Sequence, residues 1–199
     1  RTVFILLTVH PDRLGETVRS RCMRVNFGGE ADVQLEASDA AWLKSFVGMS
    51  AETGEGLMGR YRLLGKLMEH LAAKRDTIEE TQEAASALNR YADIEPTLRE
   101  KLKEELKASI EAEYRRQRGQ FLTGLQWWLR DIWLAALRQG RELLHFQDWA
   151  DTSETVGQRL SPGQALENLQ SIEATQRLLE TTNVQEALAL EVGLLKLKL

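Results

Sequence analysis

The segment from Phe121 to Leu137 constrains the fold most, because apolar side chains surround nearly its whole helical circumference. Two of its helical faces are apolar: Phe121, Leu125, Trp128, Ile132 and Ala136 form one, and Leu122, Leu129 and Trp133 form the other. A helix that is hydrophobic on several sides is stable only when other elements cover those sides. We therefore expect a central helix at 120–139 in a mainly α-helical bundle.

Other helices are indicated by boundary signals and apolar periodicity. A hydroxyl residue followed three positions later by Glu or Gln is typical of a helix N-terminus; Thr77 and Ser161 fit this pattern, Pro162 occupies the favoured first helical position, and Asn183 with Glu186 offers similar chemistry. These signals predict helices near 39–47, 57–74, 77–92, 96–118, 120–139, 162–182 and 184–198. The 96–118 helix has a thin apolar stripe among many charges, so we expect a long, solvated helix with ion-paired faces.

The N-terminal region has a different pattern. Residues 3–9 are continuously apolar and β-branched and are followed by His10-Pro11-Asp12, which indicates a strand buried on both faces, as in parallel α/β sheets. Residues 13–21 are expected to form a short helix or turn, and residues 23–27 alternate like a second strand. The fold class expected from the sequence is thus a helical bundle preceded by a short α/β remnant.

Composition limits the possible classes of protein. With 199 residues and 43% hydrophobic content, the chain can bury one core, or one core and a small appendage. Residues 1–27 carry a net charge of +3 and the rest carries −7, so only the N-terminal end is a candidate anion contact. Cys22 is the single cysteine, which excludes an intrachain disulfide and suits a reducing, cytoplasmic location.

Two features of the N-terminal end bear on its context. The apolar run at 3–9 is far shorter than the roughly 20 residues of a membrane span, so no membrane partner is expected. Because Arg1 leads directly into this run, we interpret the N-terminus as lying inside a larger protein.

Signatures of catalysis are missing from the sequence. It contains no Gly-rich phosphate loop, zinc-protease helix or nucleophile elbow. His10, His70 and His145 are too scattered to suggest a triad or a metal site, so they receive no role and no metal is expected. The chain by itself is expected to be catalytically inactive.

One short motif, Arg19-Ser20-Arg21-Cys22, lies between the two expected strands. Taken alone it favours a basic turn. With the residues before it, however, the run FILLTVHPDRLGETVRSRC at 4–22 resembles the clamp-loader family of AAA+ ATPase proteins, which combine a buried strand, a Pro-containing turn and a Ser-Arg-Cys motif. By this resemblance Thr8 would occupy or adjoin the sensor 1 position, and Arg21 would be an arginine finger reaching ATP bound by the neighbouring subunit. The chain itself would hold no cofactor.

The C-terminal half resembles the collar domain of clamp-loader subunits of the delta-prime type. The matching residues are Trp128-Leu129-Arg130-Asp131, Leu160-Ser161-Pro162, Ile172-Glu173, Arg177-Leu178-Leu179 and residues 183–191. The resemblance implies three regions: the end of an AAA+ domain at 1–27, a connecting helical region at 28–75, and a collar at 76–199. It disfavours the gamma/tau type.

The chain departs from the family pattern at three places. Gly15-Glu16 replaces a common Leu-Pro pair, and the charged segment 93–120 is interpreted as an insertion. The lid domain expected within 28–75 is poorly recognisable; residues 56–60 resemble a degenerate lid motif, which would place Arg60 near a sensor 2 position.

The resemblance implies a subunit of the DNA polymerase III clamp loader. Its partners would be gamma/tau and delta subunits, with the sliding clamp and primed DNA reached through the assembled complex. The complex, a component of the DNA polymerase holoenzyme, would supply the ATPase activity. The alternative is a purely structural helical bundle or coiled-coil adaptor without any link to ATP, which the dominance of amphipathic helices favours.

Overall fold

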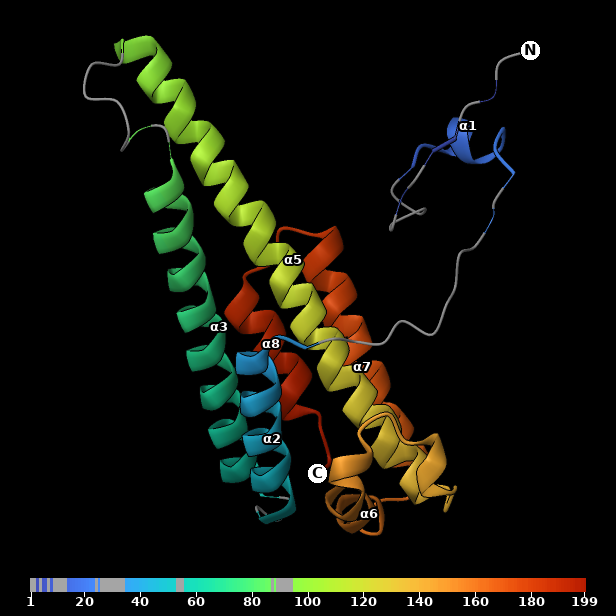
Figure 1. The fold of residues 1–199 in the computed structure, drawn as a ribbon. Helices are drawn as coiled ribbons and strands as arrows, with labels where there is room; N and C mark the ends of the chain where they lie inside the picture. Colours follow the sequence, from blue (N-terminus) through green and yellow to red (C-terminus); the bar gives the residue numbers. More distant parts are fainter. Residues whose placement is uncertain are drawn as a thin grey trace. The chain divides into compact units, whose positions relative to one another are not determined.

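The computed structural model describes residues 3, 5, 6, 8, 14–23, 25, 35–52, 56–86, 88 and 95–199, except the side chain of Arg19. The chain divides into two compact units, Arg1–Asp32 and Val33–Leu199. The first contains α1 (Glu16–Arg19), which falls within the helix or turn expected at 13–21. The second contains the long helices (Figure 1).

The expected N-terminal strands are not shown. Val3, Ile5, Leu6, Thr8, Met23 and Val25 have no regular secondary structure, and the other residues of 3–9 and 23–27 lie outside the described residues. No strand occurs anywhere in the part of the chain that the structure describes. The mainly α-helical prediction is confirmed, whereas the α/β remnant stays a prediction.

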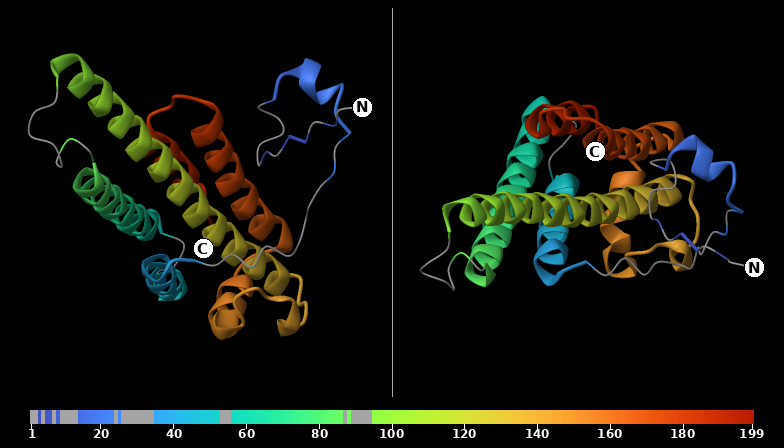
Figure 2. Two further views of the ribbon diagram at one scale, coloured as in Figure 1. Left: turned by 45° about the horizontal axis from the view of Figure 1, so that its top comes forward. Right: turned by 90° about the horizontal axis from the view of Figure 1, so that it is seen from above.

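The helical unit is built around α5 (Pro96–Ala136), whose 41 residues extend about 60 Å. Along α5 lie α7 (Pro162–Thr181) and α3 (Leu57–Ala85), while α6 (Ala150–Gly157) packs on its C-terminal half. Two further helices complete the unit: α8 (Glu186–Leu195) contacts α3 and α7, and α2 (Ala37–Glu52) contacts α3, α5 and α6 (Figures 1 and 2).

The core lies around the C-terminal half of α5, as the apolar segment predicted. Phe121, Leu125, Trp128 and Ile132 are at most 1% exposed. Trp128 meets Phe46 of α2 edge to face, with 5.9 Å between the ring centroids. The central helix is therefore covered on the α2 side as well as by the C-terminal helices.

Two expected helix boundaries are wrong. The helices expected at 57–74 and 77–92 are joined in α3, where Thr77 donates its hydroxyl to the carbonyl of Ala73 instead of capping an N-terminus. Similarly, 96–118 and 120–139 form the single α5, which continues through Gly119. Burial of α5 begins at Tyr114 and Arg118, just before the change from charged to apolar sequence near residue 120.

Other helix ends follow local chemistry. Ser161 and Gln164 form the expected capping box of α7. By contrast, α8 starts after Gln185 without a side-chain cap, so the expected cap at Asn183 is wrong. Helix α5 ends in a Schellman motif in which Arg138 takes the left-handed position (φ 58°) and the N–H of Gln139 bonds the carbonyl of Leu134 at 3.0 Å.

Helix α6 was not expected from the sequence. It follows two short 3₁₀ turns, η2 (Arg141–Leu143) and η3 (Gln147–Trp149), and its last residue, Gly157, lies against α5. A Cβ at Gly157 would lie 3.0 Å from both the Cβ of Ala135 and the amide nitrogen of Ala136. The close approach of the two helices thus depends on glycine at this position.

Candidate functional site

The residues of the Arg-Ser-Arg-Cys motif lie in and after α1. The amide of Arg21 bonds the carbonyl of Val18 at 3.1 Å and that of Ser20 bonds the carbonyl of Glu16 at 2.9 Å, so the turn that ends α1 fixes the backbone here. The side chains of Arg21 and Cys22 are exposed, and so is that of Thr8. The arrangement presents a guanidinium to solvent from a hydrogen-bonded turn.

Arg60, the suggested sensor 2 residue, lies in the first turn of α3. Its Nη1 donates to the carbonyl of Leu195 at 2.6 Å, where α8 ends. A guanidinium beside the last carbonyls of a helix satisfies acceptors that have no partner within the helix. This contact gives Arg60 a structural role in holding α3 to α8.

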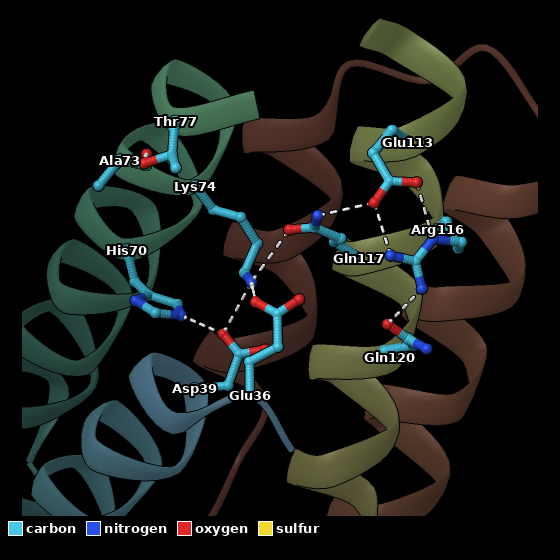
Figure 3. Close-up of polar contacts among 10 residues, drawn as sticks. All are labelled: Glu36, Asp39, His70, Ala73, Lys74, Thr77, Glu113, Arg116, Gln117 and Gln120. Atoms are coloured by element: carbon cyan, nitrogen blue, oxygen red, sulfur yellow. Dashed lines mark hydrogen bonds and ion pairs between the residues drawn. The ribbon is translucent and has the colours of Figure 1, made fainter. Parts of the chain in front are cut away.

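A partly buried polar cluster joins the start of α2 to α3 and α5 (Figure 3). Its centre is Lys74, whose ammonium lies 2.9 Å from Glu36 Oε2, 3.1 Å from Asp39 Oδ1 and 3.3 Å from Gln117 Oε1. Asp39 is only 3% exposed and also lies 2.7 Å from His70 Nε2. These contacts satisfy all three donors of Lys74 and pair the buried carboxylate with a cation.

Within the described part of the chain, the hydrogen bond of His70 is made to Asp39 and not to a hydroxyl or thiol. An Asp–His pair becomes a general base for acyl transfer when a nucleophile lies within hydrogen-bond reach. The neighbouring hydroxyls of Thr77 and Thr81 instead donate to backbone carbonyls four residues earlier, at 2.9 and 2.7 Å. In the part of the chain that the structure describes, no group of three or more His, Cys, Asp or Glu side chains could hold a metal ion.

No role was expected for His70 from the sequence, and Lys74 was not among the candidate site residues. A signal was present: His70 and Lys74 are one turn apart on α3, and Glu36 and Asp39 have a similar spacing at the start of α2. The pairing between the two helices has no sequence signature of its own. His145 stacks on Trp127 with ring centroids 4.9 Å apart, and His10 lies outside the described residues.

A second buried cluster fixes α8 to α5. Glu186 accepts a 2.5 Å hydrogen bond from the Tyr114 hydroxyl and forms an ion pair with Arg118. Arg75 of α3 stacks over the ring of Tyr114, 4.1 Å from its centroid, and pairs with Glu111 at 3.2 Å. Burial and the bond to Glu186 raise the pKa of Tyr114, so it remains a neutral donor at physiological pH.

Comparison with known proteins adds no identification. No protein-family model, curated protein or solved structure matches the chain. No helix within the described ranges combines the length and apolar character needed to cross a membrane.

Proposed function

We propose that the chain is the C-terminal part of a delta-prime type subunit of the bacterial DNA polymerase III clamp loader. The observation that carries the proposal is the Arg-Ser-Arg-Cys motif, whose Arg21 side chain is exposed at a turn held by backbone hydrogen bonds. An arginine that acts on ATP in a neighbouring subunit must have an anchored backbone and a free guanidinium. Guanidinium is always charged and can neutralise negative charge on a transferring phosphoryl group.

The helical unit supplies the other half of the proposal, a collar through which the loader ring assembles. Large apolar side chains are exposed on both α3 and α8: Leu57 and Met58 are 59% and 69% exposed, and Leu188 and Val192 are 52% and 49% exposed. The pair on each helix offers apolar surface that a neighbouring subunit could bury. The proposed partners are gamma/tau and delta subunits, with the sliding clamp and primed DNA engaged by the complete cytoplasmic complex.

A structural adaptor with no link to ATP is the second candidate function. The observation that favours it is the hairpin of α3 and the charged first half of α5, which extends past the helices that cover the core (Figures 1 and 2). The sequence preceding Arg1 in the parent gene discriminates between the two functions. A phosphate-loop ATPase half there supports the clamp loader, and its absence supports the adaptor.

The direct test measures ATP hydrolysis by a reconstituted clamp loader containing this subunit, with sliding clamp and primed DNA. We expect Arg21→Ala to leave folding and ring assembly intact and to lower hydrolysis at the affected site by up to about 10³-fold. Arg21→Lys should rescue poorly, because an ammonium does not reproduce the planar fork of guanidinium.

The matched control is Arg115→Ala, which removes an exposed arginine from the charged half of α5, outside the residues that match the family. This variant should hydrolyse ATP at the wild-type rate. Wild-type hydrolysis and clamp loading by Arg21→Ala, or unfolding of that variant in a melting experiment, would show that Arg21 belongs to an ordinary basic turn.

A further inference from the structure

Helix α8 is apolar on all sides, but its outer side is uncovered. Between residues 187 and 195 the sequence contains one polar residue, Glu191. The inner side packs on α3 and α7 through buried residues such as Leu194, whereas Leu188 and Val192 on the outer side are about half exposed. Figure 2 shows α8 at the margin of the helical unit, beside α3 and α7. A helix that is hydrophobic all round is normally buried all round, so the outer side of α8 has the composition of a contact surface.

The exposed side of α8 continues onto the start of α3. The Tyr61 hydroxyl donates to Glu191 Oε1 at 3.4 Å, and Arg60 Nη1 donates to the carbonyl of Leu195 at 2.6 Å. The first turns of α3 therefore run beside the last turns of α8. Together with exposed residues one turn before it and the two on α8, Tyr61, which is 45% exposed, forms what we call the α3/α8 face: Leu57, Met58, Tyr61, Leu188 and Val192.

The α3/α8 face carries no excess of charge at its centre. Arg60 and Glu191 lie in the seam between the two helices, have opposite signs, and are each bonded to the chain itself. Four charged residues border the face by their helical positions, two of them paired at 3.0 Å: Lys66 with Glu69, and the exposed Arg62 and Lys196. The last two lie on opposite borders, one on each helix, where solvent screens them.

A second copy of the chain fits a face of this kind. In a contact about a two-fold axis the same patch is used by both copies, so a patch with a large charge of one sign would repel itself. The centre of the α3/α8 face avoids this repulsion because its side chains are uncharged. Leu188 and Val192 are one turn apart, so both can contact a helix that crosses α8.

The area of the face is sufficient for a weak dimer. The exposed fractions of its five side chains correspond to roughly 500 Å² per copy, so a symmetric pair that covers both faces buries roughly 1,000 Å². This area is near the lower limit for a specific interface, which places the expected dissociation constant in the micromolar range.

We propose that two copies of the chain associate about a two-fold axis through the α3/α8 face, with α8 of one copy packed on α8 and the start of α3 of the other. The contact buries Leu188 and Val192 at its centre. The proposal goes beyond the clamp-loader function and depends neither on Arg21 nor on ATP. A neighbouring loader subunit that binds the same face would compete with the second copy.

Sedimentation equilibrium of the 199-residue chain tests the proposal between about 1 µM and about 500 µM. A reductant is present throughout, so that the exposed Cys22 cannot link two chains. We expect a monomer–dimer equilibrium with a Kd between about 1 and 100 µM. Salt should change this Kd little, because the centre of the face holds no ion pair between copies.

The decisive variant is Leu188→Lys, which places a charge near its own counterpart in the dimer. We expect it to raise the Kd at least about tenfold, because like charges then meet across the axis. The matched control is Leu98→Lys in the first turn of α5, where a leucine of similar exposure (48%) receives the same substitution outside the face. The control should dimerise like the wild type, and thermal melting verifies that both variants fold.

A charge-swap pair provides a second measurement. Leu188→Glu alone should dimerise as weakly as Leu188→Lys, for the same reason. An equal mixture of the two variants should associate more tightly than either alone, because opposite charges then meet across the axis.

Four outcomes overturn the proposal. They are a chain that remains monomeric up to about 500 µM, association that continues beyond a dimer, equal weakening in Leu188→Lys and Leu98→Lys, and a charge-swap mixture no tighter than either variant alone. A monomeric chain whose Leu188→Lys variant fails to assemble with gamma/tau and delta subunits would assign the face to a neighbouring loader subunit. That result would reject the second copy and support the clamp-loader function.

Discussion

Trp128 packs tightly in the core, but its indole N–H donates no hydrogen bond to a described residue. The ring is fully buried in the core, yet its indole Nε1 has no hydrogen-bond acceptor among the described residues. A buried donor without a partner costs roughly 1 to 3 kcal/mol of stability. The contribution of Trp128 therefore comes from the apolar contacts of its rings.

Two substitutions of Trp128 separate the packing of its rings from the cost of its unpaired N–H. Trp128→Ala should lower the free energy of unfolding by about 3 to 5 kcal/mol, because it leaves a large cavity. Trp128→Phe should cost less than about 2 kcal/mol, because it keeps one ring and removes the unpaired N–H. Urea unfolding of both variants measures the difference. Equal losses would mean that the indole N–H has an acceptor, such as a buried water.

For single residues, the sequence predicted the structural surroundings correctly where a residue type occurs in few kinds of surroundings. The apolar spacing around Trp128 predicted its burial, and the capping box at Ser161 was predicted from four residues. The Lys74 cluster could not be predicted, because its partners lie on three helices and each charge also has a plausible solvated alternative. Arg21 was predicted as a functional residue by resemblance, and its role stays a prediction.

At the scale of elements, the missed feature was the continuity of the long helices. Thr77 has the chemistry of an N-cap, but in α3 its hydroxyl has an alternative acceptor one turn earlier. Gly119 lowers helix propensity by only about 1 kcal/mol, which packing against α7 outweighs. The local sequence favours a helix boundary at Thr77 and at Gly119, but packing against neighbouring helices keeps both helices continuous.

Attachment of α8 depends on a contact at its first turn. Glu186 is the common acceptor for Tyr114 and for Arg118, which is 6% exposed. Removing this carboxylate leaves a buried guanidinium without its ion pair, a change that typically costs about 3 to 5 kcal/mol. The first turn of α8 therefore depends on a charged contact, whereas its remaining turns pack through Ala189, Leu190 and Leu194.

We predict that Glu186→Ala lowers the free energy of unfolding by about 3 kcal/mol or more and that amide hydrogen exchange accelerates first in α8. The control is Glu173→Ala, which removes an exposed glutamate from α7 and should change stability by under about 0.5 kcal/mol. Chemical denaturation and exchange mass spectrometry measure both effects. Unchanged exchange in α8 of Glu186→Ala would show that its apolar face alone holds the helix.

For the whole molecule, the sequence predicted a smaller, different N-terminal region followed by helices, with a connecting region at 28–75 and a collar at 76–199, but not how the helices are assembled. The division falls after Asp32, near the expected end of the first region at residue 27. What could not be predicted is that α2 lies against α5 and α6, because this packing depends on pairs such as Phe46 and Trp128 that are far apart in the sequence. Contacts between such distant residues are known only from the three-dimensional arrangement of the helices.

Among the described residues, the apolar side chains that form the core come from the second unit, beginning with the partly buried Leu35. The last residues contribute to it directly. Leu197 and Leu199 are 1% and 5% exposed, and Asn168 holds the backbone of Lys198 between them by two hydrogen bonds. The two ends of the chain should therefore differ in their importance for folding.

We predict that a chain starting at Val33 melts within about 2 °C of the whole chain, because the deletion removes none of the core residues that the structure describes. Deleting only residues 197–199 should instead lower the free energy of unfolding by about 3 kcal/mol or more, since two buried leucines and the bonds to Asn168 are lost. Thermal melting and guanidinium unfolding of both variants measure these effects. If the shorter C-terminal deletion were the milder one, stability would depend on contacts made by the first unit, and the helical body would not be an independent folding unit.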